Sequence, residues 1–63
     1  MVKLADLRRT KNLSQSEFAK IVGVSGSLIA LYETGQRTPS LKMAKRIASY
    51  FNTTIEEIEF KTR

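Results

Sequence analysis

Hydrogen-bonding side chains gather between residues 14 and 40, and their types suit binding better than catalysis. This stretch holds serines, threonines, two glutamines and one arginine, which can donate hydrogen bonds to phosphates and to base edges. Catalysis would need a nucleophile beside a base, or a set of metal ligands. The chain has no histidine and no cysteine, and no evident base stands beside its serines. We therefore predict no enzyme, no metal site and no cofactor.

Two short helices joined by a tight turn are predicted to hold these side chains. Ser14 and Glu17 have the spacing of a capping box, in which the hydroxyl accepts a free amide hydrogen and the carboxylate reaches back. Gly23 can end the first helix because glycine takes a left-handed conformation without steric cost, and Ser25 can cap a second helix that Gly35 ends. Two helices crossed over a short turn can set the second one in the DNA major groove. The predicted helices are Gln15–Val22, with Phe18, Ala19 and Val22 inward, and Gly26–Thr34, with Ile29 and Tyr32 inward.

Three further helices are predicted around this pair, and no segment alternates with the period of a strand. The first covers about residues 3–11, with Leu4 and Leu7 inward and Asn12 at its end. A fourth covers about residues 41–51 after a cap at Ser40, and its apolar stripe is Leu41, Ala44, Ile47, Ala48 and Phe51. A short fifth opens at Thr54 and Glu57, which repeat the capping-box spacing, and turns Ile55 and Ile58 inward. We predict one compact, all-α, five-helix domain over residues 1–63.

Positive charge is concentrated in the middle of the chain. Eleven basic residues oppose six acidic ones, and no acid occurs from residue 34 to residue 55. A polyanion partner is the functional interpretation, because phosphate contacts release counterions and attract basic surfaces. The alternative is that Lys42, Lys45 and Arg46 merely solvate a helix face, and charge alone leaves both interpretations open. The acidic group near the end, Glu56, Glu57 and Glu59, is explained by helix capping and solvation rather than by a metal.

Other partners and compartments leave no mark in the sequence. No apolar run is long enough to span a membrane, and no signal-peptide pattern is present, so we predict no membrane partner. The absence of cysteine is compatible with a reducing cytoplasm.

A series of short motifs, in order and at fixed spacing, carries a family resemblance. Leu7 and Arg8 precede them, and Ile47, Ala48, Ile55 and Ile58 follow. The motifs are Ser14 with Gln15, the small Ala19, the turn Gly23, Val24 and Ser25, the helix ending Tyr32, Glu33 and Gly35, and the loop Arg37, Pro39 and Ser40. The string LSQSEFAKIVGVSGSLIALYETGQRTPSL resembles the helix-turn-helix of the Cro and phage-repressor (Xre-type) DNA-binding domains. The resemblance covers nearly the whole chain.

The resemblance implies a lambda-repressor-like fold and a sequence-specific, double-stranded DNA-binding transcriptional regulator. The expected regulator is a repressor that binds a pseudo-palindromic operator as a homodimer, with its recognition helix, residues 26–34, in the major groove. It would be a cytoplasmic protein of a prokaryote or phage, Cro-like because no second domain and no small-molecule pocket are evident. The alternatives are an antitoxin-type module that neutralises a partner protein and autoregulates its operon, and a nonspecific nucleoid-type protein.

The resemblance also assigns contacts to individual residues. Arg8 and Glu33 are expected to form an ion pair across the domain. The predicted base contacts are Gln15, Ser25, Gly26, Ser27 and Leu31. The predicted phosphate contacts are Arg8, Leu28, Thr34, Gln36, Arg37, Thr38 and Ser40, aided by free amides in the loop. The predicted dimer interface is Asn52, Thr53, Ile58 and Phe60.

Several of these residues have a second interpretation. Gln15 could contact a base or a phosphate, or it could be an ordinary surface glutamine. Gly26 could let the recognition helix approach DNA closely, or it could simply be tolerated at a helix start. Leu31 could meet a thymine methyl group, lie half-buried in the core, or be part of a protein contact. Arg8 and Glu33 could be unrelated surface charges, but an acid near the end of a helix opposes the helix dipole and argues for a dedicated partner.

Overall fold

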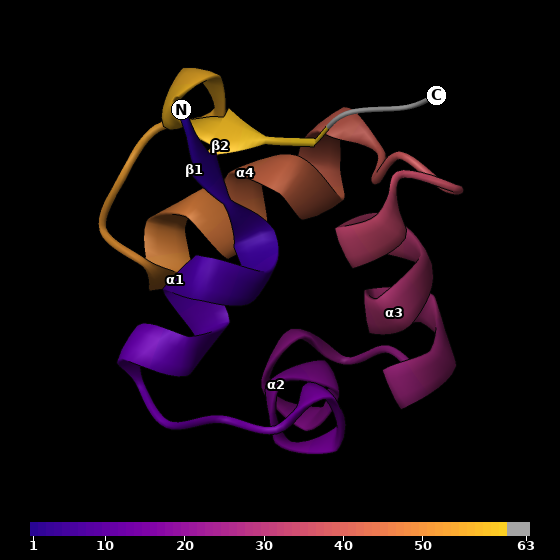
Figure 1. Cartoon of the computed structure of the whole chain (residues 1–63). Coiled ribbons are helices and arrows are strands. Elements are labelled where there is room, and N and C mark those ends of the chain that lie inside the picture. Colours follow the sequence, from indigo (N-terminus) through magenta and orange to yellow (C-terminus); the bar gives the residue numbers. More distant parts are fainter. Residues whose placement is uncertain (61–63) are drawn as a thin grey trace.

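In the computed structural model, the described residues 1–60 form four α-helices, a 3₁₀ turn and two very short strands (Figure 1). The helices are α1 (Leu4–Thr10), α2 (Gln15–Val22), α3 (Gly26–Thr34) and α4 (Leu41–Tyr50). The strands are β1 (Val2–Lys3) and β2 (Ile58–Glu59), and the 3₁₀ turn η1 (Ile55–Glu57) leads into β2. The predicted bounds of α2 and α3 are confirmed at both ends.

Serine caps open α2, α3 and α4. Ser14 accepts a hydrogen bond from the Glu17 amide at 3.0 Å, and the Ser14 amide donates to the Glu17 carboxylate at 2.8 Å. The predicted capping box is therefore complete. Ser25 and Ser40 each accept from the amide three residues later. The hydrogen bond from the Ser14 amide, followed by that of the Ser14 hydroxyl, lowers the pKa of Glu17 below its ordinary value of 4.5.

Residues in the left-handed conformation follow each of the helices. Gly23 after α2 has φ 82° and Gly35 after α3 has φ 80°, so both positions favour a residue without a Cβ. Asn12 and Asn52 take the same conformation after α1 and α4, with φ 57° and 58°. Asparagine is among the few side chains that visit this region readily.

One cluster of buried side chains joins all four helices. It consists of Leu4, Phe18, Ala19, Val22, Ile29, Tyr32, Ile47, Ala48 and Ile58. The rings of Tyr50 and Phe51 extend it, with centroids 6.0 Å and 5.2 Å from that of Phe18. Removal of this apolar surface from water is the main force that stabilises the fold. Ile29 and Tyr32 anchor the inner face of α3, which leaves its other face free for contacts outside the domain.

The predicted fifth α-helix is wrong. Residues 55–57 form only the 3₁₀ turn η1, and Thr54 makes no side-chain cap. The chain then extends, and β2 pairs in parallel with β1, with Val2 opposite Ile58 and Lys3 opposite Glu59 (Figure 1). A strand of two residues is too short to show a period of two, and its partner lies at the other end of the sequence. The first helix was predicted to begin at about residue 3, but α1 begins at Leu4 because Lys3 belongs to β1.

The predicted apolar stripe of α4 is wrong at its first residue. Leu41 is 65% exposed, whereas Ala44, Ile47 and Ala48 are buried. The buried face of α4 begins about one turn after the helix does, so a periodic apolar residue in the first turn has no core beneath it. Leu41 therefore lies on the surface, next to the loop that connects α3 to α4.

Candidate nucleic-acid interface

The helix-turn-helix is formed by α2, the turn at residues 23–25, and α3. The amides of Gly23 and Val24 both donate to the Ala19 carbonyl, at 2.8 Å and 2.9 Å, which closes the C-terminus of α2. α3 starts so close to α2 that a Cβ placed on Gly26 would lie 3.3 Å from the Ser16 hydroxyl oxygen. The missing side chain at Gly26 thus permits close packing of α3 on α2. Sequence reasoning considered close approach to DNA but missed this contact between the two helices.

A buried polar network joins three helices beside this turn. Arg8 of α1 donates from Nε to Glu33 Oε2 at 2.7 Å and from Nη2 to Glu33 Oε1 at 3.3 Å. Arg8 Nη1 donates to the Leu13 carbonyl at 2.7 Å. Gln15 Nε2 donates to Glu33 Oε1 at 2.9 Å. Glu33 of α3 therefore holds both α1 and the first residue of α2.

The predicted ion pair between Arg8 and Glu33 is present and more buried than a surface pair. The two side chains are 10% and 7% exposed. A guanidinium has five N–H groups, and three of those of Arg8 bind within the protein. Two remain for a phosphate, on a side chain that is nearly covered. The phosphate contact of Arg8 stays a prediction, and the main task of this residue in the structure is to hold Glu33 and the loop before α2.

The outer side of α3 carries the residues that were predicted to touch bases. Ser25 and Ser27 are exposed. Leu31 is half-buried but does not pack against the core cluster, whereas Leu28 does. The two leucines therefore differ: Leu31 belongs to the outer side of α3, and Leu28 covers the core at its edge.

The loop from residue 35 to residue 40 is exposed at most of its predicted phosphate contacts. Gln36, Arg37, Thr38 and Ser40 are exposed, and Pro39 is buried. The expectation of a free amide is wrong for Arg37, because its amide donates to the Leu31 carbonyl at 3.3 Å, as the Gln36 amide does at 3.0 Å. These hydrogen bonds close the end of α3, so the side chains rather than the amides of these two residues remain for DNA.

Thr34 and Gln36 are tied to each other. The Thr34 hydroxyl donates to the Ala30 carbonyl at 3.1 Å and accepts from Gln36 Nε2 at 3.1 Å. Both residues are exposed, so a phosphate contact from either would compete with this hydrogen bond.

Arg46 has a structural contact that sequence reasoning missed. Solvation of a face of α4 was one of its two interpretations, but its Nη1 donates to the Val22 carbonyl at 3.1 Å, at the C-terminus of α2. Cationic side chains are favoured at helix C-termini because the last carbonyls lack partners. The sequence shows that residue 46 is basic, but it does not show which helix end lies beside α4.

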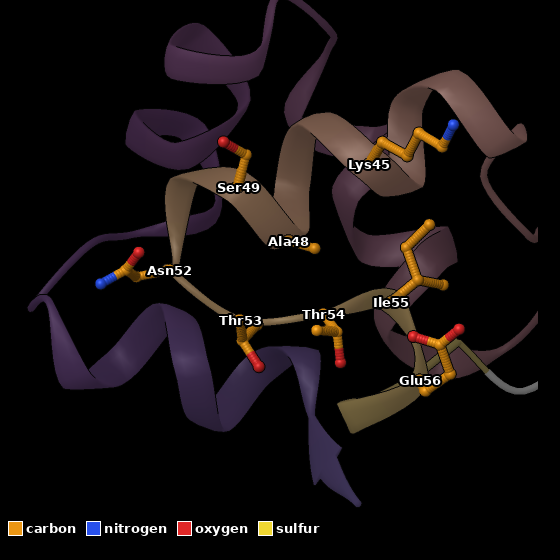
Figure 2. Close-up of a pocket in the computed structure, with 8 residues that line it drawn as sticks. All are labelled: Lys45, Ala48, Ser49, Asn52, Thr53, Thr54, Ile55 and Glu56. Atoms are coloured by element: carbon orange, nitrogen blue, oxygen red, sulfur yellow. The ribbon is translucent and has the colours of Figure 1, made fainter.

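The predicted dimer residues occupy two different environments. Ile58 is 2% exposed, so its side chain has no surface left for a second protomer unless the fold opens. Asn52 and Thr53 line an open groove of about 580 Å³ beside α4, together with Lys45, Ala48, Ser49, Thr54, Ile55 and Glu56 (Figure 2). Phe60 is half-buried and borders an apolar hollow of about 430 Å³ whose lining includes Met1 and Ile55.

Within residues 1–60, no helix is long and apolar enough to cross a membrane. No group of three or more acidic residues there is arranged to hold a metal ion.

Comparison with known proteins gives consistent matches. The helix-turn-helix family matches residues 4–58. An uncharacterized HTH-type transcriptional regulator of Methanocaldococcus jannaschii is 45% identical over 56 residues, which cover 89% of this chain and 85% of that protein. Another, from Archaeoglobus fulgidus, is 43% identical over 56 residues, covering 89% of this chain and 79% of that protein. The cryptic phage CTXphi transcriptional repressor RstR of Vibrio cholerae is 32% identical over 56 residues, covering 89% of this chain and 50% of that protein. No solved structure matches the chain.

Proposed function

We propose that this protein is a sequence-specific repressor of transcription, since the chain belongs to the helix-turn-helix family of DNA-binding regulators. The resemblance to Cro and phage-repressor domains is confirmed by these matches, and membership of this family implies binding to double-stranded DNA. The finer proposal is that the chain binds a pseudo-palindromic operator as a homodimer, with α3 in the major groove, and blocks transcription by occupying the site.

The two-sidedness of α3 carries this proposal. Ile29 and Tyr32 fix one side in the core, while Ser25 and Ser27 are exposed and Leu31 stays off the core. Serine hydroxyls can bond to several bases, and a leucine can meet a thymine methyl group. Such an outer side supplies few direct base contacts, so a second protomer would be needed for useful specificity.

The proposed phosphate contacts lie at the C-terminal end of α3 and in the loop that follows it. Arg37, Thr38 and Ser40 follow it in the exposed loop, and Thr34 and Gln36 stand at its end. These groups would fix the position of the protein on the DNA backbone without selecting a sequence.

The proposed dimer contact uses Asn52, Thr53 and Phe60. Asn52 is exposed, and Thr53 and Phe60 are half-buried, so all three retain surface for a second protomer. In a two-fold dimer the half-sites lie about 34 Å apart, one turn of DNA, so that both copies of α3 meet the same face.

Site spacing tests the proposal. A binding site is first selected from a random duplex library, and gel shifts then compare the full site, one half-site, and a full site with half a turn of DNA inserted. We expect cooperative binding of two protomers to the full site only. Equal affinity of one protomer for the half-site and the full site would contradict the dimer, and stoichiometric recovery of a second protein from the native host would favour the antitoxin alternative.

A further inference from the structure

The Gln15 side chain is held in one orientation by the carboxylate beside it. A carboxylate only accepts hydrogen bonds, so the group that lies 2.9 Å from Glu33 Oε1 has to be the amide nitrogen of Gln15. Arg8 binds the same carboxylate with two nitrogens and fixes its place. Turning the Gln15 amide over would set its carbonyl oxygen against a carboxylate oxygen, which is repulsive.

The carbonyl oxygen of Gln15 is left open to solvent. Within residues 1–60, the bond to Glu33 is the one hydrogen bond that the Gln15 side chain makes. Every buried side-chain nitrogen or oxygen in this part of the chain has a partner, so an oxygen without one is not buried. The backbone of its neighbour Ser16 lies close to Gly26 at the start of α3, and the Gln15 side chain reaches Glu33 in the last turn of the same helix. The Gln15 amide therefore lies against the helix that is proposed to enter the major groove.

An open carbonyl oxygen restricts what Gln15 can recognise. A phosphate oxygen is also an acceptor, so it cannot bond to this carbonyl and could be bound only through the second hydrogen of the Gln15 amide. The major groove offers donors at the adenine N6 and cytosine N4 amino groups. If the second amide hydrogen of Gln15 donates to N7 at the same time, adenine is the better partner.

Building on the proposed DNA binding, we propose that Glu33 is a positioning residue that makes Gln15 read a base amino group in the major groove rather than a phosphate. Glu33 has no contact with DNA in this proposal. It acts through the single hydrogen bond that turns the Gln15 carbonyl outward, while the bond pair from Arg8 keeps the carboxylate in place.

The test starts with duplexes selected from a random library by the wild-type chain and by Gln15→Ala. The variant should lose its preference at one base pair of each half-site, by roughly fivefold to tenfold, and keep the others. A second duplex then lacks the exocyclic amino group of the preferred adenine or cytosine at that pair. Wild type should lose the same factor on this duplex, and Gln15→Ala should be indifferent to the change. Which of the two bases is selected distinguishes adenine from cytosine.

Two further variants separate positioning from folding. In Glu33→Gln a neutral amide can offer Gln15 either an oxygen or a nitrogen, so sensitivity to the amino group should fall towards that of Gln15→Ala. Arg37→Ala is the control, because it removes an exposed loop cation that is proposed to contact a phosphate and leaves the network of Arg8, Gln15 and Glu33 intact. It should lower affinity for all duplexes alike and keep the sensitivity. All measurements are made at a temperature where circular dichroism shows each variant folded.

A third variant keeps the test decisive if Glu33→Gln does not fold. Glu33→Asp keeps the negative charge beside Arg8 but draws the carboxylate back by one methylene from Gln15, so sensitivity to the amino group should fall here too. The inference is overturned if Gln15→Ala weakens all sequences equally, as loss of a phosphate contact would. It is also overturned if wild type ignores removal of the amino group, or if Arg37→Ala abolishes sensitivity as Glu33→Gln does. A wild-type chain that selects no sequence would instead contradict the proposed function.

Discussion

The helix-turn-helix and the segment from residue 52 to residue 60 are specified by different kinds of sequence information. In the first, a capping box at Ser14 and left-handed glycines at Gly23 and Gly35 act over three or four residues. In the second, Ile58 becomes a buried strand residue because Val2, at the other end of the chain, pairs with it. Helix ends can therefore be read locally, whereas pairing between distant segments cannot.

The largest expected effect concerns Ile58, a buried residue whose strand pairing with Val2 the sequence did not predict. Ile58→Ala should lower the free energy of unfolding by about 2–4 kcal/mol, because it leaves a cavity in the core. Urea denaturation measures this loss, which should be the same at low and high protein concentration. Phe60→Ala, at a half-buried position, is the control and should cost less. A loss of unfolding free energy that grows with protein concentration would instead indicate that Ile58 lies in a dimer interface.

The second effect concerns Arg8 and Glu33, which tie α1 to the helix-turn-helix. Each alanine variant should cost about 2–3 kcal/mol, because it leaves a nearly buried charge without its partner. The double variant should cost less than the sum, with a coupling of about 1–2 kcal/mol. This exceeds the value expected for exposed side chains, about 1 kcal/mol at most. Additive losses in a denaturation cycle would show that the pair does not form in solution.

A smaller effect tests the close packing of α3 on α2. Alanine is favoured over glycine inside helices by roughly 0.5–1 kcal/mol, but at position 26 its Cβ would press on the Ser16 hydroxyl. Gly26→Ala should therefore gain little stability in the wild-type chain and the full amount in a Ser16→Ala background. Thermal unfolding of the four proteins measures the difference. The same gain in both backgrounds would mean that α3 stands further from α2.

The smallest effect is the pH dependence that comes from the capping box of α2. The pKa of Glu17 is lower in the folded chain than its ordinary value of 4.5. As the pH falls, Glu17 is therefore protonated in the unfolded chain before it is protonated in the folded chain. The stability that ionised Glu17 provides is complete above about pH 4.5 and is lost as the pH falls through the folded pKa. Glu17→Gln should lack this part of the acid dependence in urea denaturation. Parallel curves for variant and wild type would argue against the capping box.

The sequence predicted most of the fold, but it predicted only some of the contacts in the candidate site. Both ends of α2 and α3 follow from caps and glycines, and the pairing of Arg8 with Glu33 follows from the family resemblance. The roles of Ser16 and Arg46 could not be predicted, because each depends on which helices lie side by side. The bond from Gln15 to Glu33 joins residues 18 apart, and nothing local marks it. Three-dimensional neighbours, rather than residue types, decide these contacts.

Binding of the wild-type chain to duplex DNA across a salt series is the decisive measurement. Fluorescence anisotropy should compare the selected duplex with a random duplex of the same length. If each protomer of a dimer neutralises about four phosphates, the logarithm of affinity should fall against the logarithm of salt with a slope near −7. The selected duplex should bind more tightly than the random one at each salt concentration. No binding to either duplex at low salt, or equal affinity for both, would contradict a sequence-specific DNA-binding function for α3.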